Sequence, residues 1–117
     1  MKKVYRLAER KVFETITKNR KKIASKKYLI HFQKNNSKHF RIAIITSKAN
    51  FKSAVVRNKI KRQVRTFFDK IPNKNIPLDL LLIVSPGYIT DSYAKNQTDF
   101  LIQIKKIVTS FESKKGL

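Results

Sequence analysis

The sequence predicts an α+β fold, a two-layer α/β sandwich of order α-β-β-β-α-β-α. Apolar residues repeat with helical spacing from Ala54 to Asp69. The segment from Leu78 to Val84 is almost wholly apolar, which is typical of a strand buried on both faces. Since 117 residues suit one modest core, we expect a single domain, residues 1–117. Helices on one face of the sheet would leave the other face partly open for a binding cleft.

The first part of the chain predicts one helix and three strands. Val12, Phe13 and Ile16 recur at helical spacing within a short helix from Lys11 to Lys18. The remaining predicted elements are a brief strand at Ile23-Ala24, an alternating strand from Tyr28 to Gln33, a turn from Lys34 to Lys38, and a β-branched strand from Phe40 to Thr46 antiparallel to the previous one.

The second part begins with the clearest helix of the chain, from Ala54 to Asp69. Its apolar stripe consists of Val56, Ile60, Val64 and Phe67. Ser53 is the expected N-cap, and Ile71-Pro72 ends the helix. The face opposite the stripe centres on Arg57, Asn58, Lys61, Arg62 and Arg65.

A last strand and a last helix complete the predicted fold. The apolar strand from Leu78 to Val84 is followed by a turn at Ser85-Pro86-Gly87. Asp91 or Ser92 caps the final helix, and residues 113–117 are expected to be a frayed tail. The core-facing positions of this helix are Phe100, Leu101, Ile104, Ile107, Val108 and Phe111.

The charge of the chain indicates a polyanionic partner. The formal net charge is +21, and 16 Lys or Arg lie between Glu14 and Asp69, an interval without any Asp or Glu. A domain this basic repels itself unless a polyanion neutralises it, and nucleic acid is the default partner. A merely solubilising surface rarely needs so one-sided a charge. A membrane partner is not expected, since no separate amphipathic helix with a basic face is present.

Enzyme chemistry within the protein has little support in the sequence. Without cysteine there is no thiol chemistry, and His31 and His39 have no third metal ligand nearby. The seven carboxylates are scattered, and two glycines cannot form a phosphate-binding Gly-rich loop. We therefore expect no catalytic residue, no metal site and no cofactor bound by the protein alone. No long apolar segment is present, so a cytoplasmic location is expected.

The segment from Ala54 to Arg65, AVVRNKIKRQVR, is the most specific motif of the chain. It contains three of the seven arginines, whose planar guanidinium groups bind phosphate at two points. The segment closely resembles the signature of the bacterial ribonuclease P protein family. The resemblance extends over nearly the whole chain, through Tyr5-Arg6-Leu7 with Phe13, Phe40 to Ile44 with Ser47-Lys48, and Asp79 to Val84 with Pro86-Gly87.

The resemblance implies that the chain is a subunit of an endoribonuclease whose chemistry belongs to a catalytic RNA with magnesium. The protein would bind that RNA and the single-stranded 5′ leader of precursor tRNA, and would have no obligate protein partner. The implied RNA-binding residues are Arg57, Asn58, Lys59, Lys61, Arg62, Arg65, Ser47 and Lys48. The resemblance also implies a left-handed β-α-β crossover through this helix, where general principles favour a right-handed one.

The leader cleft implied by the resemblance consists of Phe13, Thr17 and His31. Phe13 matches the first aromatic of the cleft, whereas Thr17 and His31 stand where the family usually has aromatic residues. The loop from Ser47 to Ser53 also lacks the usual glycine. We therefore expect the cleft to bind the leader less through stacking and more through charge. The alternatives are a ribosomal protein or general RNA chaperone of similar fold and, with less support, a protein-only nuclease.

Overall fold

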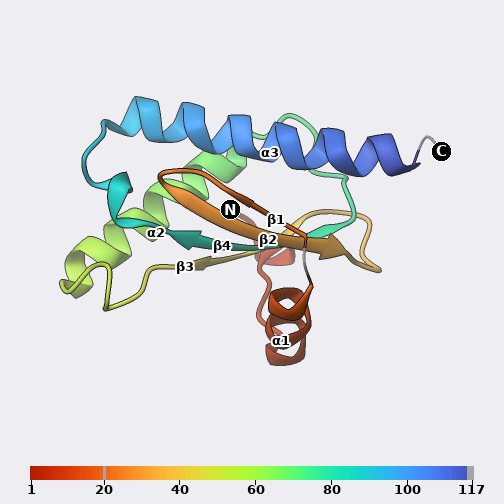
Figure 1. The fold of residues 1–117 in the computed structure, drawn as a ribbon, viewed down its shortest axis with the longest axis horizontal. Helices are drawn as coiled ribbons and strands as arrows, with labels where there is room; N and C mark the ends of the chain where they lie inside the picture. Colours follow the sequence, from red (N-terminus) through yellow and green to blue (C-terminus); the bar gives the residue numbers. More distant parts are fainter. Residues whose placement is uncertain (20, 116–117) are drawn as a thin grey trace.

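The computed structural model describes residues 1–19 and 21–115, and it has the predicted α+β fold (Figure 1). Its elements are η1 (Lys3–Tyr5), α1 (Arg10–Lys18), β1 (Lys22–Ala24), β2 (Tyr28–Lys34), β3 (Arg41–Ile45), α2 (Ala54–Asp69), β4 (Leu78–Val84), η2 (Pro86–Tyr88) and α3 (Tyr93–Lys115). The bounds of α2 and β4 are those predicted. α3 continues to Lys115, further than expected, while residues 116 and 117 of the predicted tail lie outside the described residues.

The four strands form one sheet in the order β1-β2-β4-β3. β4 pairs antiparallel with β2 and parallel with β3. β3 therefore runs antiparallel to β2, as predicted, but the two strands are not neighbours. The reason is burial, because β4 is apolar at nearly every position and is best covered in the centre of the sheet. β3, α2 and β4 form the left-handed crossover that the family resemblance implied.

One face of the sheet carries the main hydrophobic core, beneath α2 and α3 (Figure 1). Alternate residues of the strands point to this face, because successive side chains of a strand alternate between faces. The buried residues include Tyr28 and Ile30 of β2, Leu80 and Leu82 of β4, Ile60 and Val64 of α2, and Phe100 and Ile104 of α3. The Tyr28 hydroxyl donates a hydrogen bond of 2.7 Å to the Asn96 carbonyl, which ties β2 to α3.

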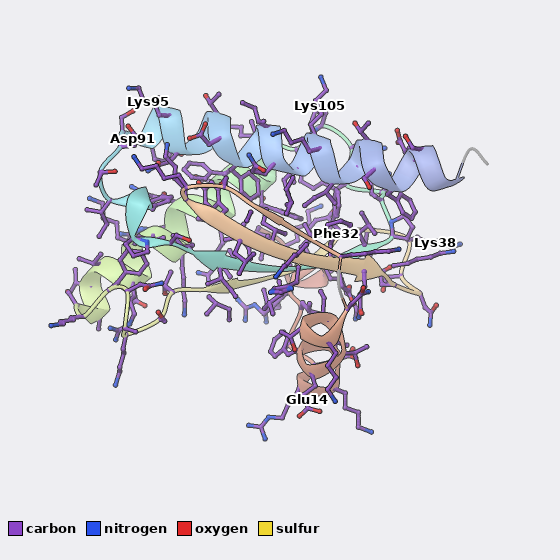
Figure 2. All side chains as sticks on the ribbon, in the orientation of Figure 1. Glu14, Phe32, Lys38, Asp91, Lys95 and Lys105 are labelled. Carbon is purple, nitrogen blue, oxygen red and sulfur yellow. The ribbon has the colours of Figure 1, made fainter. Side chains whose placement is uncertain are left out.

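Among the described residues, the opposite face of the sheet is covered by α1 and the segment before it (Figure 1). A small cluster of Leu7, Ile16, Ala43 and Leu81 is buried there. We expected all helices on one face, but the apolar stripe of α1 needs a partner too. Leu81 and the small Ala43 provide one on the second face of β4 and β3. Figure 2 shows Glu14 on the side of α1 that points away from the sheet.

Ion pairs join the start of α1 to this open face, and the Asp79 side chain in them is buried whereas that of Glu9 is exposed. Arg41 donates two hydrogen bonds to Asp79, from Nε to Oδ1 at 2.8 Å and from Nη2 to Oδ2 at 2.9 Å. Its Nη1 donates to Glu9 Oε1 at 3.1 Å. Asn35 Nδ2 donates to Asp79 Oδ1 at 2.8 Å. We call Arg41, Asp79, Glu9 and Asn35 the Arg41 cluster. It connects the residue before α1 with the starts of β3 and β4. It holds α1 in place over the sheet.

Candidate nucleic-acid interface

The basic side chains of α2 are exposed because its apolar stripe is buried. The Ser53 hydroxyl accepts a hydrogen bond of 3.4 Å from the Val56 N–H, so Ser53 is the N-cap, as predicted. Ile60, Val64 and Phe67 are buried with Phe68, which the periodicity did not select. The side chains that the helix exposes to solvent include Asn58, Lys59, Arg62 and Arg65, while Arg57 and Lys61 are half-buried. No ion pair joins these basic groups to a carboxylate within the described residues. Their charge is available to a polyanion.

Arg57 has a structural contact that the sequence did not predict. Its Nη1 donates hydrogen bonds to the carbonyls of Phe51 at 2.8 Å and Lys52 at 3.0 Å. These bonds hold the end of the loop before α2, and Phe51 itself is buried. Arg57 therefore fixes the loop before α2, next to the other basic side chains of the helix.

The loop from Ser47 to Ser53 is ordered by its own side chains. The Ser47 hydroxyl accepts a hydrogen bond of 3.2 Å from the Asn50 N–H, and Asn50 Nδ2 donates to the Val84 carbonyl at 3.3 Å. Ser47 is thus occupied in the turn, whereas Lys48 is exposed beside it. Of the two predicted loop residues, Lys48 is the one whose side chain is exposed and charged.

A hollow of about 300 Å³ lies between α1, β3 and α2. Phe13 lines it from α1, Ala43 and Ile45 line it from β3, and Lys61 and Arg65 line it from α2. One wall therefore has an aromatic ring and the opposite wall has two cations. We call this hollow the Phe13 cleft. Unpaired nucleotides need both kinds of contact, because their bases stack and their phosphates are charged.

Thr17 and His31 do not line the Phe13 cleft among the described residues. Thr17 is exposed on α1, and its hydroxyl makes 3.0 Å hydrogen bonds to the carbonyls of Phe13 and Glu14. His31 lies on β2, opposite Leu81 of β4, on the same open face of the sheet. Burial and the positive charge of Lys22 lower the pKa of His31. The lining of the Phe13 cleft thus includes Phe13, Lys61 and Arg65, but not Thr17 or His31.

Nowhere in residues 1–19 and 21–115 do three His, Asp or Glu side chains gather in a way that could hold a metal ion. Within the same residues, no helix combines the length and the apolar character needed to cross a bilayer.

A family model described as Ribonuclease P matches residues 1–108. The chain belongs to the ribonuclease P protein family. The ribonuclease P protein component of Mycoplasma genitalium is 40% identical over 107 residues, covering 92% of this chain and 84% of the relative. That of Ureaplasma parvum serovar 3 is 34% identical, with 83% and 85% covered. Such family members are subunits of a tRNA-processing ribonuclease.

Solved structures of ribonuclease P proteins share the fold. A mutant RNase P protein of Staphylococcus aureus superposes with a TM-score of 0.79 at 27% identity, covering 89% of this chain and 90% of that one. The RNase P protein of Thermotoga maritima gives a TM-score of 0.74 at 25% identity, with 86% and 96% covered. The fold assigned from the sequence and the family resemblance is confirmed.

Sequence reasoning missed several residues around the ribonuclease P protein surface. Arg6 lines the Phe13 cleft, and Arg41 is neutralised by Asp79 and Glu9 instead of facing solvent. Because Glu9 and Asp79 are far from Arg41 in the sequence, no local pattern indicated these ion pairs. For Arg6 a signal existed, since it lies in the Tyr5-Arg6-Leu7 segment that resembles the family.

Proposed function

We propose that this protein binds the catalytic RNA of ribonuclease P through the exposed face of α2. The observation that supports this most is the row of Asn58, Lys59, Arg62 and Arg65 on one exposed helix face, without acidic partners in the described residues. Guanidinium groups bind phosphate oxygens at two points, and Lys adds point charges. Lys48, on the loop before α2, extends the same surface.

The Phe13 cleft is proposed to receive the 5′ leader of precursor tRNA. Its hollow is bordered by α2, so a leader strand there would lie beside the catalytic RNA bound on the helix. Phe13 offers a ring to a base, while Lys61 and Arg65 face the backbone phosphates. Thr17 adds no ring to this wall, so charge contributes more than stacking. In this proposal the protein adds a binding surface for precursor tRNA to the one that the catalytic RNA provides.

We assign the hydrolysis of the phosphodiester bond to the catalytic RNA and to magnesium ions that it binds. The protein's part is electrostatic, since it holds together two polyanions that repel each other. In this proposal no protein side chain attacks the phosphate or transfers a proton. The product is a tRNA with a mature 5′ end.

Precursor-tRNA cleavage by the cognate catalytic RNA tests the proposal. The rate is measured with and without the protein, at low and at high magnesium. We expect strong stimulation at low magnesium and weak stimulation at high magnesium, because divalent ions then provide the same screening. Absence of stimulation at low magnesium would favour a ribosomal protein or general RNA chaperone. Cleavage by the protein without RNA would favour a nuclease.

Salt dependence gives a second test, on binding alone. Because the exposed cations of α2 and its loop displace counterions, the logarithm of the affinity should fall steeply with the logarithm of salt concentration. A protein that neutralises about five phosphates should show a slope near −4. Filter binding between roughly 50 and 400 mM salt measures the slope, and a slope near zero would contradict a charge-dominated interface.

A further inference from the structure

A second hollow, of about 380 Å³, lies on the other flank of α2. Lys59 and Gln63 line it from α2, Tyr88 and Ile89 line it from η2 and the residue after it, and Tyr93 lines it from the start of α3. Lys61 and Arg65, by contrast, line the Phe13 cleft. α2 therefore stands between two hollows, with Asn58 and Arg62 on the ridge between them. We call the second hollow the Tyr93 pocket.

Tyr93 is held in place although 46% of its surface is exposed. Its hydroxyl lies 2.8 Å from Thr66 Oγ1. The Thr66 hydroxyl donates to the Gln63 carbonyl at 2.6 Å, so its proton is used and Tyr93 donates to Thr66. The Tyr93 ring also packs on Phe67, with centroids 5.0 Å apart and an interplanar angle of 58°. Two contacts thus fix the ring on the flank of α2 before any partner binds.

The electrostatics of the Tyr93 pocket favour an anionic partner. Lys59 is exposed on its α2 wall, one turn from Arg62. Asp91 is the one carboxylate among the described lining residues, and it is engaged by Lys27 Nζ at 2.8 Å and approached by Lys95 Nζ at 3.9 Å. Figure 2 shows Asp91 and Lys95 together at the start of α3. A phosphate near Lys59 would therefore not face an unpaired negative charge.

We propose that the Tyr93 pocket receives an unpaired nucleotide of the catalytic RNA, whose base stacks on Tyr93 while Lys59 contacts its phosphate. This rests on the proposed function, because α2 must lie on that RNA. An unpaired nucleotide is required, since bases within a duplex hide their faces from a protein ring. Ile89, 58% exposed at the rim, gives the base a second apolar surface. The leader is not the occupant, because its cleft lies on the opposite flank of α2.

The test compares four proteins for affinity toward the catalytic RNA transcribed in vitro: wild type, Tyr93→Leu, Tyr93→Phe and Arg62→Ala. Loss of one stacking contact should weaken binding about 5- to 150-fold in Tyr93→Leu, with an unchanged salt slope. Tyr93→Phe keeps the ring and should lose less than Tyr93→Leu. Arg62→Ala should weaken binding and reduce the salt slope by about one.

The outcomes separate the inference from the proposed function. Wild-type affinity in Tyr93→Leu, with weakened binding in Arg62→Ala, would overturn the Tyr93 pocket and leave the α2 surface standing. Wild-type affinity in both would overturn the α2 surface as well. Equal losses in Tyr93→Leu and Tyr93→Phe would also overturn stacking, because the ring is then irrelevant.

A measurement on the wild-type protein covers the case in which Tyr93→Leu does not fold. Ultraviolet crosslinking of the wild-type complex, followed by peptide mapping, should identify a nucleotide of the catalytic RNA attached to Tyr93. Crosslinks confined to α2 and α1 peptides would contradict the inference. Circular dichroism melting of each variant accompanies the binding data.

Discussion

The two faces of the sheet differ in the side chains that they carry and in how much apolar surface they bury. Under α2 and α3, one continuous apolar core fills the space and includes Tyr28, Phe67 and Phe100. Under α1 the buried apolar cluster is small, and the same strands place Arg41, Asp79 and His31 on that side. The closed face stabilises the fold, and the open face leaves room for the Phe13 cleft. Most of the apolar burial therefore lies on the closed face, away from the Phe13 cleft.

The largest expected effect belongs to the closed face. Ile60→Asp places a carboxylate without a partner in the core beneath α2, where Ile60 is only 3% exposed. We expect a loss of more than about 4 kcal/mol in the free energy of unfolding, enough to unfold much of the protein. Circular dichroism and urea titration measure it. Arg65→Ala, on the exposed side of the same helix, is the control and should remain folded.

The next effect belongs to the Arg41 cluster on the open face. Arg41→Met removes the cation from Asp79, whose side chain is 2% exposed. We expect a loss of about 3 kcal/mol, the low end for a broken buried pair, because Asn35 still donates to the carboxylate. Urea denaturation measures it, with Lys38→Met as a control for charge.

The double variant Arg41→Met, Asp79→Leu sharpens this result. Since no buried charge remains, it should recover most of the lost stability. If it is no more stable than Arg41→Met, the ion pair is not the source of the loss. The single variant should also reduce discrimination between precursor and mature tRNA, because α1 and Phe13 then lose their anchor.

A smaller effect on stability, and a direct one on binding, is expected for Phe13→Ala. Phe13 is half-buried in the wall of the Phe13 cleft, so the fold should persist. Loss of a stacking ring should reduce the ratio of precursor to mature tRNA affinity of the holoenzyme about 5- to 150-fold. Thr17→Ala, one helical turn away and outside the lining, is the control. An unchanged ratio in Phe13→Ala would place the leader elsewhere.

The smallest effect is a pH dependence from His31. Its pKa is lowered in the folded state by burial and by Lys22, so the unfolded state binds the proton more readily. The stabilisation is present above the unfolded pKa of about 6.5 and is lost as pH falls below it. Between about pH 7.5 and pH 5, His31→Gln should lose less stability than wild type. Parallel slopes for the two proteins would contradict this assignment.

Local patterns were sufficient for the elements themselves. α2 begins and ends where its periodicity and the Ser53 cap predicted, and β4 has the predicted bounds. The basic face of α2 was also predictable, because helical geometry alone places Arg62 and Arg65 opposite Ile60 and Val64. Ser92 accepts a hydrogen bond from the Lys95 N–H at 3.2 Å, as one of the two predicted caps should.

Contacts between distant segments were beyond the reach of these patterns. Arg41 looked like one more basic residue, because Glu9 and Asp79 are far from it in the sequence. Arg57 was predicted to face RNA only, although its reach to the Phe51 carbonyl also orders a loop. Thr17 and His31 were grouped with Phe13 in one leader cleft, yet neither lines the hollow that Phe13 shares with Lys61 and Arg65.

The sequence by itself determined the helices, the strands, the basic character and, through its motif, the family. These depend on periodicity, capping and composition, which are properties of residues close together in the sequence. Only the tertiary structure decided that β4 lies between β2 and β3, that α1 covers the second face, and that α2 stands between two hollows. The physical reason is that these arrangements come from burial and charge pairing between segments far apart in the chain, and Tyr93 meets Thr66 only after both helices have packed.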